Sequence, residues 1–215
     1  MERTQAHHQI EIHPFDAFVP QNAKMLILGS FPCNRNLKNT SATQPEYGEW
    51  FYLGSGKSNF WRIMENIYEA TPNLQQRSAK EALLQQNQIA LADIALRIER
   101  KQNNCLDTSL RVLEYNTKAI IEILSQQPIE KVACNSRWVE KWYLKNIQPA
   151  FLHIPVVYLL SPSPAADASI RRRADFKQFI SQNPAKNLLD FRIHYYKERL
   201  PTPQNNEIIN NFLGI

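Results

Sequence analysis

The sequence predicts an α/β fold in which a parallel sheet of about four strands has helices on both faces. Two observations lead to this prediction. Short, wholly apolar segments alternate along the 215-residue chain with segments whose apolar residues recur at helical spacing. A continuous apolar run is typical of a strand buried on both faces, and the helical spacing is typical of a helix that buries one face.

The first predicted strand is the apolar run from Met25 to Leu28, which ends at Gly29. Three later segments have the same character: "QIALADIA" (88–95), "EKVACNS" (130–136) and "IPVVYLLSPSP" (154–164). Each is short and ends in polar or turn-forming residues, as expected of buried parallel strands.

The predicted helices lie between and after these strands. Phe60, Ile63, Met64 and Ile67 form an apolar stripe in "NFWRIMENIYEA" (59–70). Residues 107–127 are predicted as one long amphipathic helix, with Asp107, Thr108 or Ser109 as its N-cap and Pro128 beyond its end. The other predicted helices are 78–86, 137–146 and 168–182, the last of them before a polar tail.

Length and composition indicate one domain over residues 1–215, with a core at about 13–182 and a C-terminal extension over 183–215. The chain is 43% hydrophobic but has no apolar run long enough to cross a membrane, and "MERTQAHHQIEIHPF" lacks the apolar centre of a signal peptide. A cytoplasmic protein without a membrane partner, and a monomer, is therefore expected.

Charge and cysteine content narrow the possible functions. Cys33, Cys105 and Cys134 form no C-x-x-C pair, so neither a disulfide framework nor a metal site is expected. The formal net charge of +5 would suit a polyanionic partner, although an ordinary solvated surface has the same composition. Arg171, Arg172 and Arg173 form the only run of three like charges.

The carboxyl ends of the strands are the expected location of a ligand, because crossovers diverge there in open parallel sheets. Four junctions fall at this edge: 29–33, Asp93, 135–136 and the loop from Ser161 to Pro164. Four of the five glycines also lie between Gly29 and Gly56, which indicates a segment of unusual backbone such as a binding loop.

The stretch "GSGKS" (54–58) spells the second half of a phosphate-binding P-loop. The full pattern requires another glycine where this chain has Phe51, and the preceding "QPEYGEWF" is a poor buried strand. A nucleotide hydrolase is therefore only a remote alternative.

Three stretches resemble the hypoxanthine-DNA glycosylase branch of the uracil-DNA glycosylase superfamily: "HPFDAFVPQNAKMLILGSFPC" (13–33), "FYLGSGKSNFWRIM" (51–64) and "YLLSPSPAADA" (158–168). The resemblance covers roughly residues 13 to 180. It implies a three-layer α/β/α sandwich around a mostly parallel four-stranded sheet. It also implies a monofunctional enzyme that flips a damaged base out of DNA and hydrolyses its N-glycosidic bond without a metal or a cofactor.

The resemblance is weakest at the residues that would act on the substrate. With Phe60 and Trp61 aligned on the family's Phe-Trp pair, Ser58 stands at the position of the catalytic asparagine and Asn59 at the next residue. Leu53 replaces a stacking tyrosine, Cys33 a serine and Ala166 an asparagine. The resemblance therefore leaves two possibilities open: a glycosylase with an altered pocket, or a catalytically silent member that binds DNA.

Carried over position by position, the resemblance gives candidate site residues in three groups. The catalytic candidates are Ser58 and Asn59. The candidates for the base pocket are Ser30, Phe31, Cys33, Tyr52, Leu53, Asp93 and Asn135. The candidates for DNA contact are Lys57, Ser161, Ser163, Arg171, Arg172 and Arg173, with Ile170 as a wedge that would enter the duplex.

Ordinary structural roles stay open for several of these residues. Phe31 could belong to the core, Asp93 could cap a helix or form a salt bridge, and Asn135 could simply satisfy its turn. The three arginines could form a solvated helix face. None of His7, His8, His13 and His153 has a sequence partner that suggests a catalytic dyad.

Overall fold

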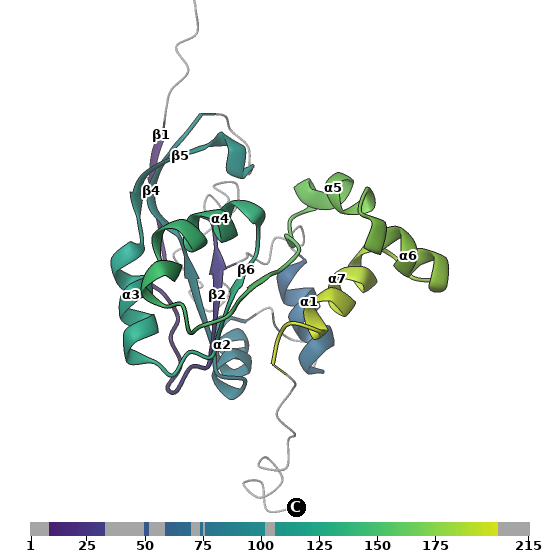
Figure 1. Ribbon diagram of the computed structural model, residues 1–215, viewed down its shortest axis with the longest axis horizontal. Coiled ribbons are helices and arrows are strands. Elements are labelled where there is room, and N and C mark those ends of the chain that lie inside the picture. The colour runs from purple at the N-terminus through teal and green to yellow at the C-terminus, as the bar shows by residue number, and fades with distance from the viewer. Residues whose placement is uncertain are drawn as a thin grey trace, which may run out of the picture.

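The computed structural model describes residues 9–32, 50–51, 59–69, 74, 76–101 and 106–201 (Figure 1). Its strands are β1 (Gln9–Ile12), β2 (Met25–Gly29), β3 (Ile89–Asp93), β4 (Ala95–Arg100), β5 (Leu110–Tyr115), β6 (Lys131–Cys134) and β7 (Val156–Tyr158). Its α-helices are α1 (Phe60–Tyr68), α2 (Arg77–Gln86), α3 (Thr117–Gln126), α4 (Arg137–Asn146), α5 (Asp167–Arg171), α6 (Ala174–Gln182) and α7 (Leu188–Lys197). Three short 3-10 turns are η3 (Asp107–Ser109), η4 (Gln148–Ala150) and η5 (Pro164–Ala166).

The central sheet has four parallel strands in the order β3-β2-β6-β7, so the predicted parallel sheet is confirmed. All five residues of β2 and of β3 are buried, which explains why these strands are continuous apolar runs in the sequence. The register pairs Gly29 with Asp93 and Leu28 with Cys134, so these strands end together. The residues after them therefore meet at one edge of the sheet.

Alternate residues of β2 belong to two different cores, one on each face of the sheet. Met25 and Ile27 pack in a core with residues of α1, α2 and α7, whereas Leu26 and Leu28 pack in a core with residues of α3 and α4. Figure 1 shows α3 and α4 on one side of β2 and β6, and α1 and α7 on the other. The result is the expected three-layer α/β/α sandwich.

The predicted helix over 107–127 is wrong in its first half. That half consists of η3 and β5, and only α3 is helical. β5 pairs with β4 in a second, antiparallel sheet of order β1-β4-β5. Leu110 and Val112, two residues apart, pack on the buried Ala95 and Ile98 of β4. Apolar residues at alternate positions of a half-exposed strand can also fit the spacing of an amphipathic helix, because the two patterns share some positions.

The predicted last helix over 168–182 is also wrong, since it is divided into α5 and α6 and a further helix follows. The division falls at Arg173, whose backbone is extended with φ −67° and ψ 144°. The further helix, α7, lies in the segment predicted as a C-terminal extension, yet Leu188, Phe191 and Tyr196 join the core beside α1. Among the described residues, no helix combines the length and apolar character needed to span a bilayer.

Tyr143 of α4 provides a test of the core beneath the helices. Its hydroxyl is buried and has no hydrogen-bond partner among the described residues. Because an unsatisfied buried hydroxyl costs roughly 1 to 3 kcal/mol, we expect Tyr143→Phe to leave the free energy of unfolding unchanged or to raise it by about 1 kcal/mol. Urea unfolding followed by circular dichroism measures this change.

Tyr196→Phe is the matched control for that substitution. The Tyr196 hydroxyl is equally buried but donates to the carbonyl oxygen of Leu160 at 2.7 Å. Its removal is expected to lower the free energy of unfolding by about 1 kcal/mol. Equal losses in the two variants would show that the Tyr143 hydroxyl is satisfied after all.

Candidate functional site

All four predicted junctions follow parallel strands that end at the carboxyl edge of the central sheet. The amide of Leu159 donates to the carbonyl of Cys134 at 2.8 Å, which joins the ends of β7 and β6. Ile94 donates its amide to the carbonyl of Gly29 at 2.9 Å, which joins the ends of β3 and β2. The amide of Asn135 donates to the carbonyl of Leu28 at 3.0 Å, which joins the ends of β6 and β2. Ser30, Asp93 and Asn135 are thereby placed at one edge, and their roles in a base pocket stay predictions.

A buried His13–Asp93 pair lies at this edge. His13 Nε2 is 3.0 Å from Asp93 Oδ2, and His13 Nδ1 is within hydrogen-bonding distance of the carbonyl and the amide of Phe15, at 2.7 and 3.2 Å. The Asp93 carboxylate is an acceptor for a proton on Nε2, and the Phe15 carbonyl is an acceptor for a proton on Nδ1. The pair was not predicted from sequence, because 80 residues separate its members. The "HPF" stretch at His13 was the one available signal.

Aromatic rings surround His13. Its ring centroid lies 5.4 Å from that of Phe31, 5.8 Å from that of Phe51 and 5.9 Å from that of Phe15. Phe31 is only 9% exposed and also packs on β4, so it is part of a small core as well as part of this edge. The side chains of His13 and Asp93 are only 4% and 8% exposed, and burial of this kind strengthens the electrostatic interaction between them.

Asp107 is a second carboxylate at this edge. Ser30 Oγ donates to Asp107 Oδ1 at 2.8 Å, so η3 is tied to the end of β2. Burial raises the pKa of Asp107 above its usual range, and the nearby Asp93 charge adds to that rise. The hydroxyls of Ser30 and Ser136 and the charge of Arg100 oppose the rise in the pKa. Asp107 therefore holds a proton more readily than an exposed aspartate does.

The predicted N-cap role of Asp107 is wrong, because no long helix begins there. Asp107 instead lies beside Ser30 at the carboxyl edge of the sheet, a position that was not predicted from sequence. Its place within residues 13 to 180, over which the chain resembles the glycosylase family, was the available signal.

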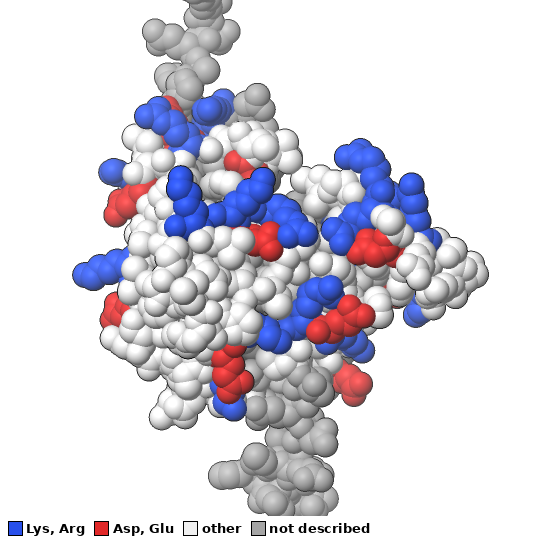
Figure 2. All heavy atoms as spheres, in the orientation of Figure 1, with Lys and Arg blue, Asp and Glu red and all other residues white. Residues whose placement is uncertain are grey.

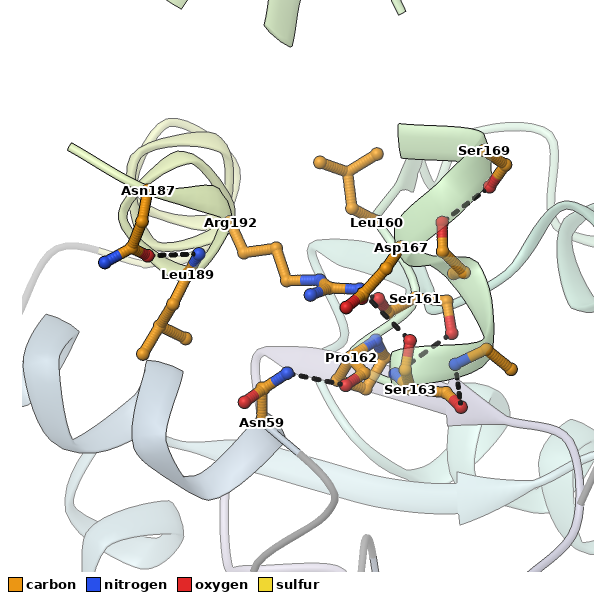
Figure 3. A network of polar contacts seen from close by, with 12 residues as sticks. Asn59, Leu160, Ser161, Pro162, Ser163, Asp167, Ser169, Asn187, Leu189 and Arg192 are labelled. Carbon is orange, nitrogen blue, oxygen red and sulfur yellow. Dashed lines mark hydrogen bonds and ion pairs between the residues drawn. The ribbon is translucent and has the colours of Figure 1, made fainter. Parts of the chain in front are cut away.

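The loop from Ser161 to Pro164 follows β7 and lies beside the start of α1 (Figure 3). Asn59 donates its backbone amide to the carbonyl of Pro162 at 3.2 Å, and its side-chain Nδ2 lies 3.4 Å from the same oxygen. Asn59 Oδ1 accepts from Arg62 Nη1 at 3.5 Å. The side chain of this catalytic candidate is therefore directed at the Ser–Pro loop.

The remaining DNA-contact candidates differ in their solvent exposure and in their ion pairs. Arg171 and Arg172 are exposed, whereas Arg173 is paired with Asp175 at 2.6 Å. Ile170 is only 3% exposed and packs in the core beside α7. Its side chain therefore does not face the solvent in this arrangement, and its role as a wedge stays a prediction.

Basic side chains gather on one face of the molecule, over α4 and α5 (Figure 2). Those of α5 are among the predicted arginines, but the contribution of α4 was not predicted. Its basic residues are Arg137, Lys141 and Lys145, all exposed. In the described ranges, no three His, Cys, Asp or Glu side chains converge as metal ligands would.

Several predicted site residues lie outside the described residues, in segments 33–49 and 52–58. They are Cys33, Tyr52, Leu53, Lys57 and Ser58, together with the rest of the "GSGKS" stretch. Their predicted roles stay as stated.

A solved structure with the same fold is the solution NMR structure of a "putative Uracil DNA glycosylase" from Methanosarcina acetivorans. The TM-score is 0.57 and the sequence identity 21%, and the match covers 88% of this chain and 98% of that chain. The predicted uracil-DNA glycosylase-like fold is therefore confirmed. No protein-family model matches the chain, and no curated protein matches it.

Proposed function

We propose that this chain is a monofunctional DNA glycosylase of the uracil-DNA glycosylase superfamily, which hydrolyses the N-glycosidic bond of a flipped, deaminated base in base excision repair. The observation that carries the proposal is the carboxyl edge of the sheet. There, Asp107 is bonded to Ser30 and the His13–Asp93 pair lies beside aromatic rings, in a fold shared with a protein named a "putative Uracil DNA glycosylase". Hypoxanthine and uracil are the proposed bases.

Hydrolysis of an N-glycosidic bond requires little from the protein. Water attacks the sugar carbon C1′ while the bond from C1′ to the base nitrogen breaks, and the bonding electron pair leaves with the base. The Asp107 carboxylate is the proposed acceptor of the proton that the water loses. Backbone amides near Ser30 would stabilise the negative charge on the departing base, where a single such donor is worth roughly 3 to 4 kcal/mol.

The proposed role of Asp107 compensates for the main difference between this sequence and the family that it resembles. Ser58 replaces the expected asparagine, and the side chain of Asn59 is directed at Pro162. The carboxylate of Asp107, which η3 places at this edge of the sheet, would orient the water instead. Phe31 and Tyr52 are the proposed stacking surfaces for the flipped base, for which stacking contributes roughly 1 to 3 kcal/mol.

DNA would lie across the face that presents α4 and α5. The hydroxyls of Ser161 and Ser163 and the side chains of Arg171 and Arg172 are the proposed phosphate contacts. The exposed basic residues of α4 extend the same charge. Binding is accordingly expected to weaken steeply with salt.

A base-release assay tests the proposal. Purified full-length chain is incubated with single- and double-stranded oligonucleotides that carry one hypoxanthine, uracil or xanthine, and alkali then breaks the strand wherever a base has been lost. Strand breaks are expected at the hypoxanthine or uracil position and none in the undamaged oligonucleotide. Tight, salt-dependent DNA binding without any release would refute hydrolysis and identify the silent DNA-binding alternative.

A further inference from the structure

The C-terminal helix α7 lies beyond the segment that resembles the glycosylase family, and it inserts a charged side chain into the protein. Arg192 is only 1% exposed. A buried guanidinium is costly unless its N–H groups find acceptors. The burial of Arg192 therefore indicates a specific contact inside the protein, in contrast to a charged residue on a solvated helix face.

The acceptors of Arg192 all belong to one short segment, from the Ser–Pro loop to the start of α5. Arg192 Nε donates to the carbonyl of Ser161 at 3.0 Å, and Nη2 donates to the carbonyl of Ser163 at 3.1 Å. Nη2 also lies 2.8 Å from Asp167 Oδ1, which balances the charge. Figure 3 shows Arg192 reaching from its helix to this segment.

Two further donors complete the set, so that four consecutive carbonyls are held. The Tyr196 hydroxyl donates to Leu160 at 2.7 Å, and the amide of Asn59 donates to Pro162 at 3.2 Å. Residues 160 to 163 thus turn every carbonyl oxygen toward protein donors. Because a carbonyl oxygen repels a phosphate, this arrangement leaves the opposite edge of the loop as the one suited to DNA.

The loop also carries two hydroxyl groups that can act as donors. Ser161 Oγ accepts from the amide of Ser163 at 3.3 Å, and Ser163 Oγ accepts from the amide of Ala165 at 3.3 Å. Each hydroxyl uses its oxygen as the acceptor in these bonds, which leaves its hydrogen to donate to a phosphate oxygen.

The same helix, α7, also contacts α1, the helix that begins next to the catalytic candidate Asn59. α7 packs against α1, and Figure 1 shows the two helices side by side. Asn59 is the N-cap of α1 and the residue that contacts Pro162. The start of α7 is itself fixed, because Asn187 Oδ1 accepts from the amides of Leu189 and Asp190 while Asp190 accepts from the amide of Asn187.

From these contacts we infer that Arg192 is a positioning residue for DNA binding: it fixes the carbonyl side of the Ser–Pro loop, so that the hydroxyls of Ser161 and Ser163 face the phosphate backbone. Tyr196 assists it from the next turn of α7. This inference rests on the proposed function only in that the ligand of the loop is DNA.

Arg192→Lys tests the inference, since lysine keeps the charge but cannot bond two carbonyls and a carboxylate in the same geometry. The full-length variant is expected to bind a short duplex oligonucleotide about tenfold more weakly, which is the loss expected for hydrogen bonds to a charged group. Fluorescence anisotropy at low salt measures the Kd. Tyr196→Phe is expected to weaken binding in the same direction, though less.

Leu124→Ala is the stability control, because Leu124 lies in the core on the other face of the sheet. Binding is compared at a temperature at which all variants are folded. Equal affinities for Arg192→Lys and Leu124→Ala would overturn the inference, as would wild-type protein that binds no DNA. Wild-type protein that binds DNA but releases no base would refute only the glycosylase proposal.

Discussion

Asp107→Asn is expected to remove nearly all base-release activity while leaving the protein at least as stable as the wild type at neutral pH. Asparagine can still accept the hydrogen bond that Ser30 Oγ donates, so the geometry is conserved. It cannot take a proton from water. Loss of a general base typically costs roughly 10² to 10⁴-fold in rate, and single-turnover base release measures that loss.

The gain or retention of stability follows from the direction of the pKa shift. Burial raises the pKa of Asp107, so the folded chain binds this proton more tightly than the unfolded chain does. The stability of the wild type therefore falls as the pH rises from the usual aspartate pKa through the raised one, and stays lower above it. Asp107→Asn removes this penalty, which urea unfolding at acidic and at neutral pH will reveal.

The same shift predicts the pH dependence of the reaction. A general base acts only when it is ionised, so activity should fall as the pH drops through the raised pKa of Asp107. Wild-type base release in Asp107→Asn would show that another group accepts the proton. Asp175→Asn is a control for the charge change, because Asp175 is paired with Arg173 away from the sheet edge.

Glu11→Ala is expected to be among the most destabilising single substitutions in this protein. Glu11 of β1 accepts two hydrogen bonds from Arg100 of β4, at 2.7 and 3.0 Å, and the two side chains are only 7% and 3% exposed. Arg100 also donates to the carbonyl of Pro32 at 3.1 Å. Removing one member of a buried ion pair leaves the other charge uncompensated, which costs roughly 3 to 5 kcal/mol.

Glu81→Ala is the matched control for Glu11→Ala. Its pair with Arg77 is equally short, at 2.7 Å, but the side chains are 34% and 49% exposed. An exposed pair at this helical spacing contributes only about 0.3 to 0.5 kcal/mol. Similar losses of unfolding free energy in the two variants would contradict the expected role of burial. Glu11→Ala combined with Arg100→Met should recover part of the loss, since neither charge of this pair then remains buried.

The central sheet could be predicted from sequence because full burial leaves an unambiguous pattern. The strands β2 and β3 are buried at every residue, and their sequences are apolar runs that admit few other interpretations. β5 could not be predicted in this way, because it is partly exposed and its apolar residues fit a helical spacing equally well. Half-buried strands require knowledge of their neighbours.

The site was predictable only in outline. The rule for parallel sheets correctly brought Ser30 and Asp93 to one edge, since it depends on local strand direction alone. The partners of these residues come from distant segments: Asp93 is bonded to His13, and Ser30 to Asp107, 77 residues away. Arg192 of α7 likewise reads as a polar surface residue in sequence, although it is buried.

The hydrogen bonds that hold the Ser–Pro loop also affect the order in which the protein folds. Its contacts join residues far apart in the chain: Asn59 and Pro162 are separated by 103 residues, and Arg192 lies 31 residues beyond Ser161. Contacts across such long separations require large loops to close and are among the slow steps of assembly. The sheet can form while the rest of the chain is still being synthesised. The proposed ability to bind DNA would be acquired late, when α7 packs against α1.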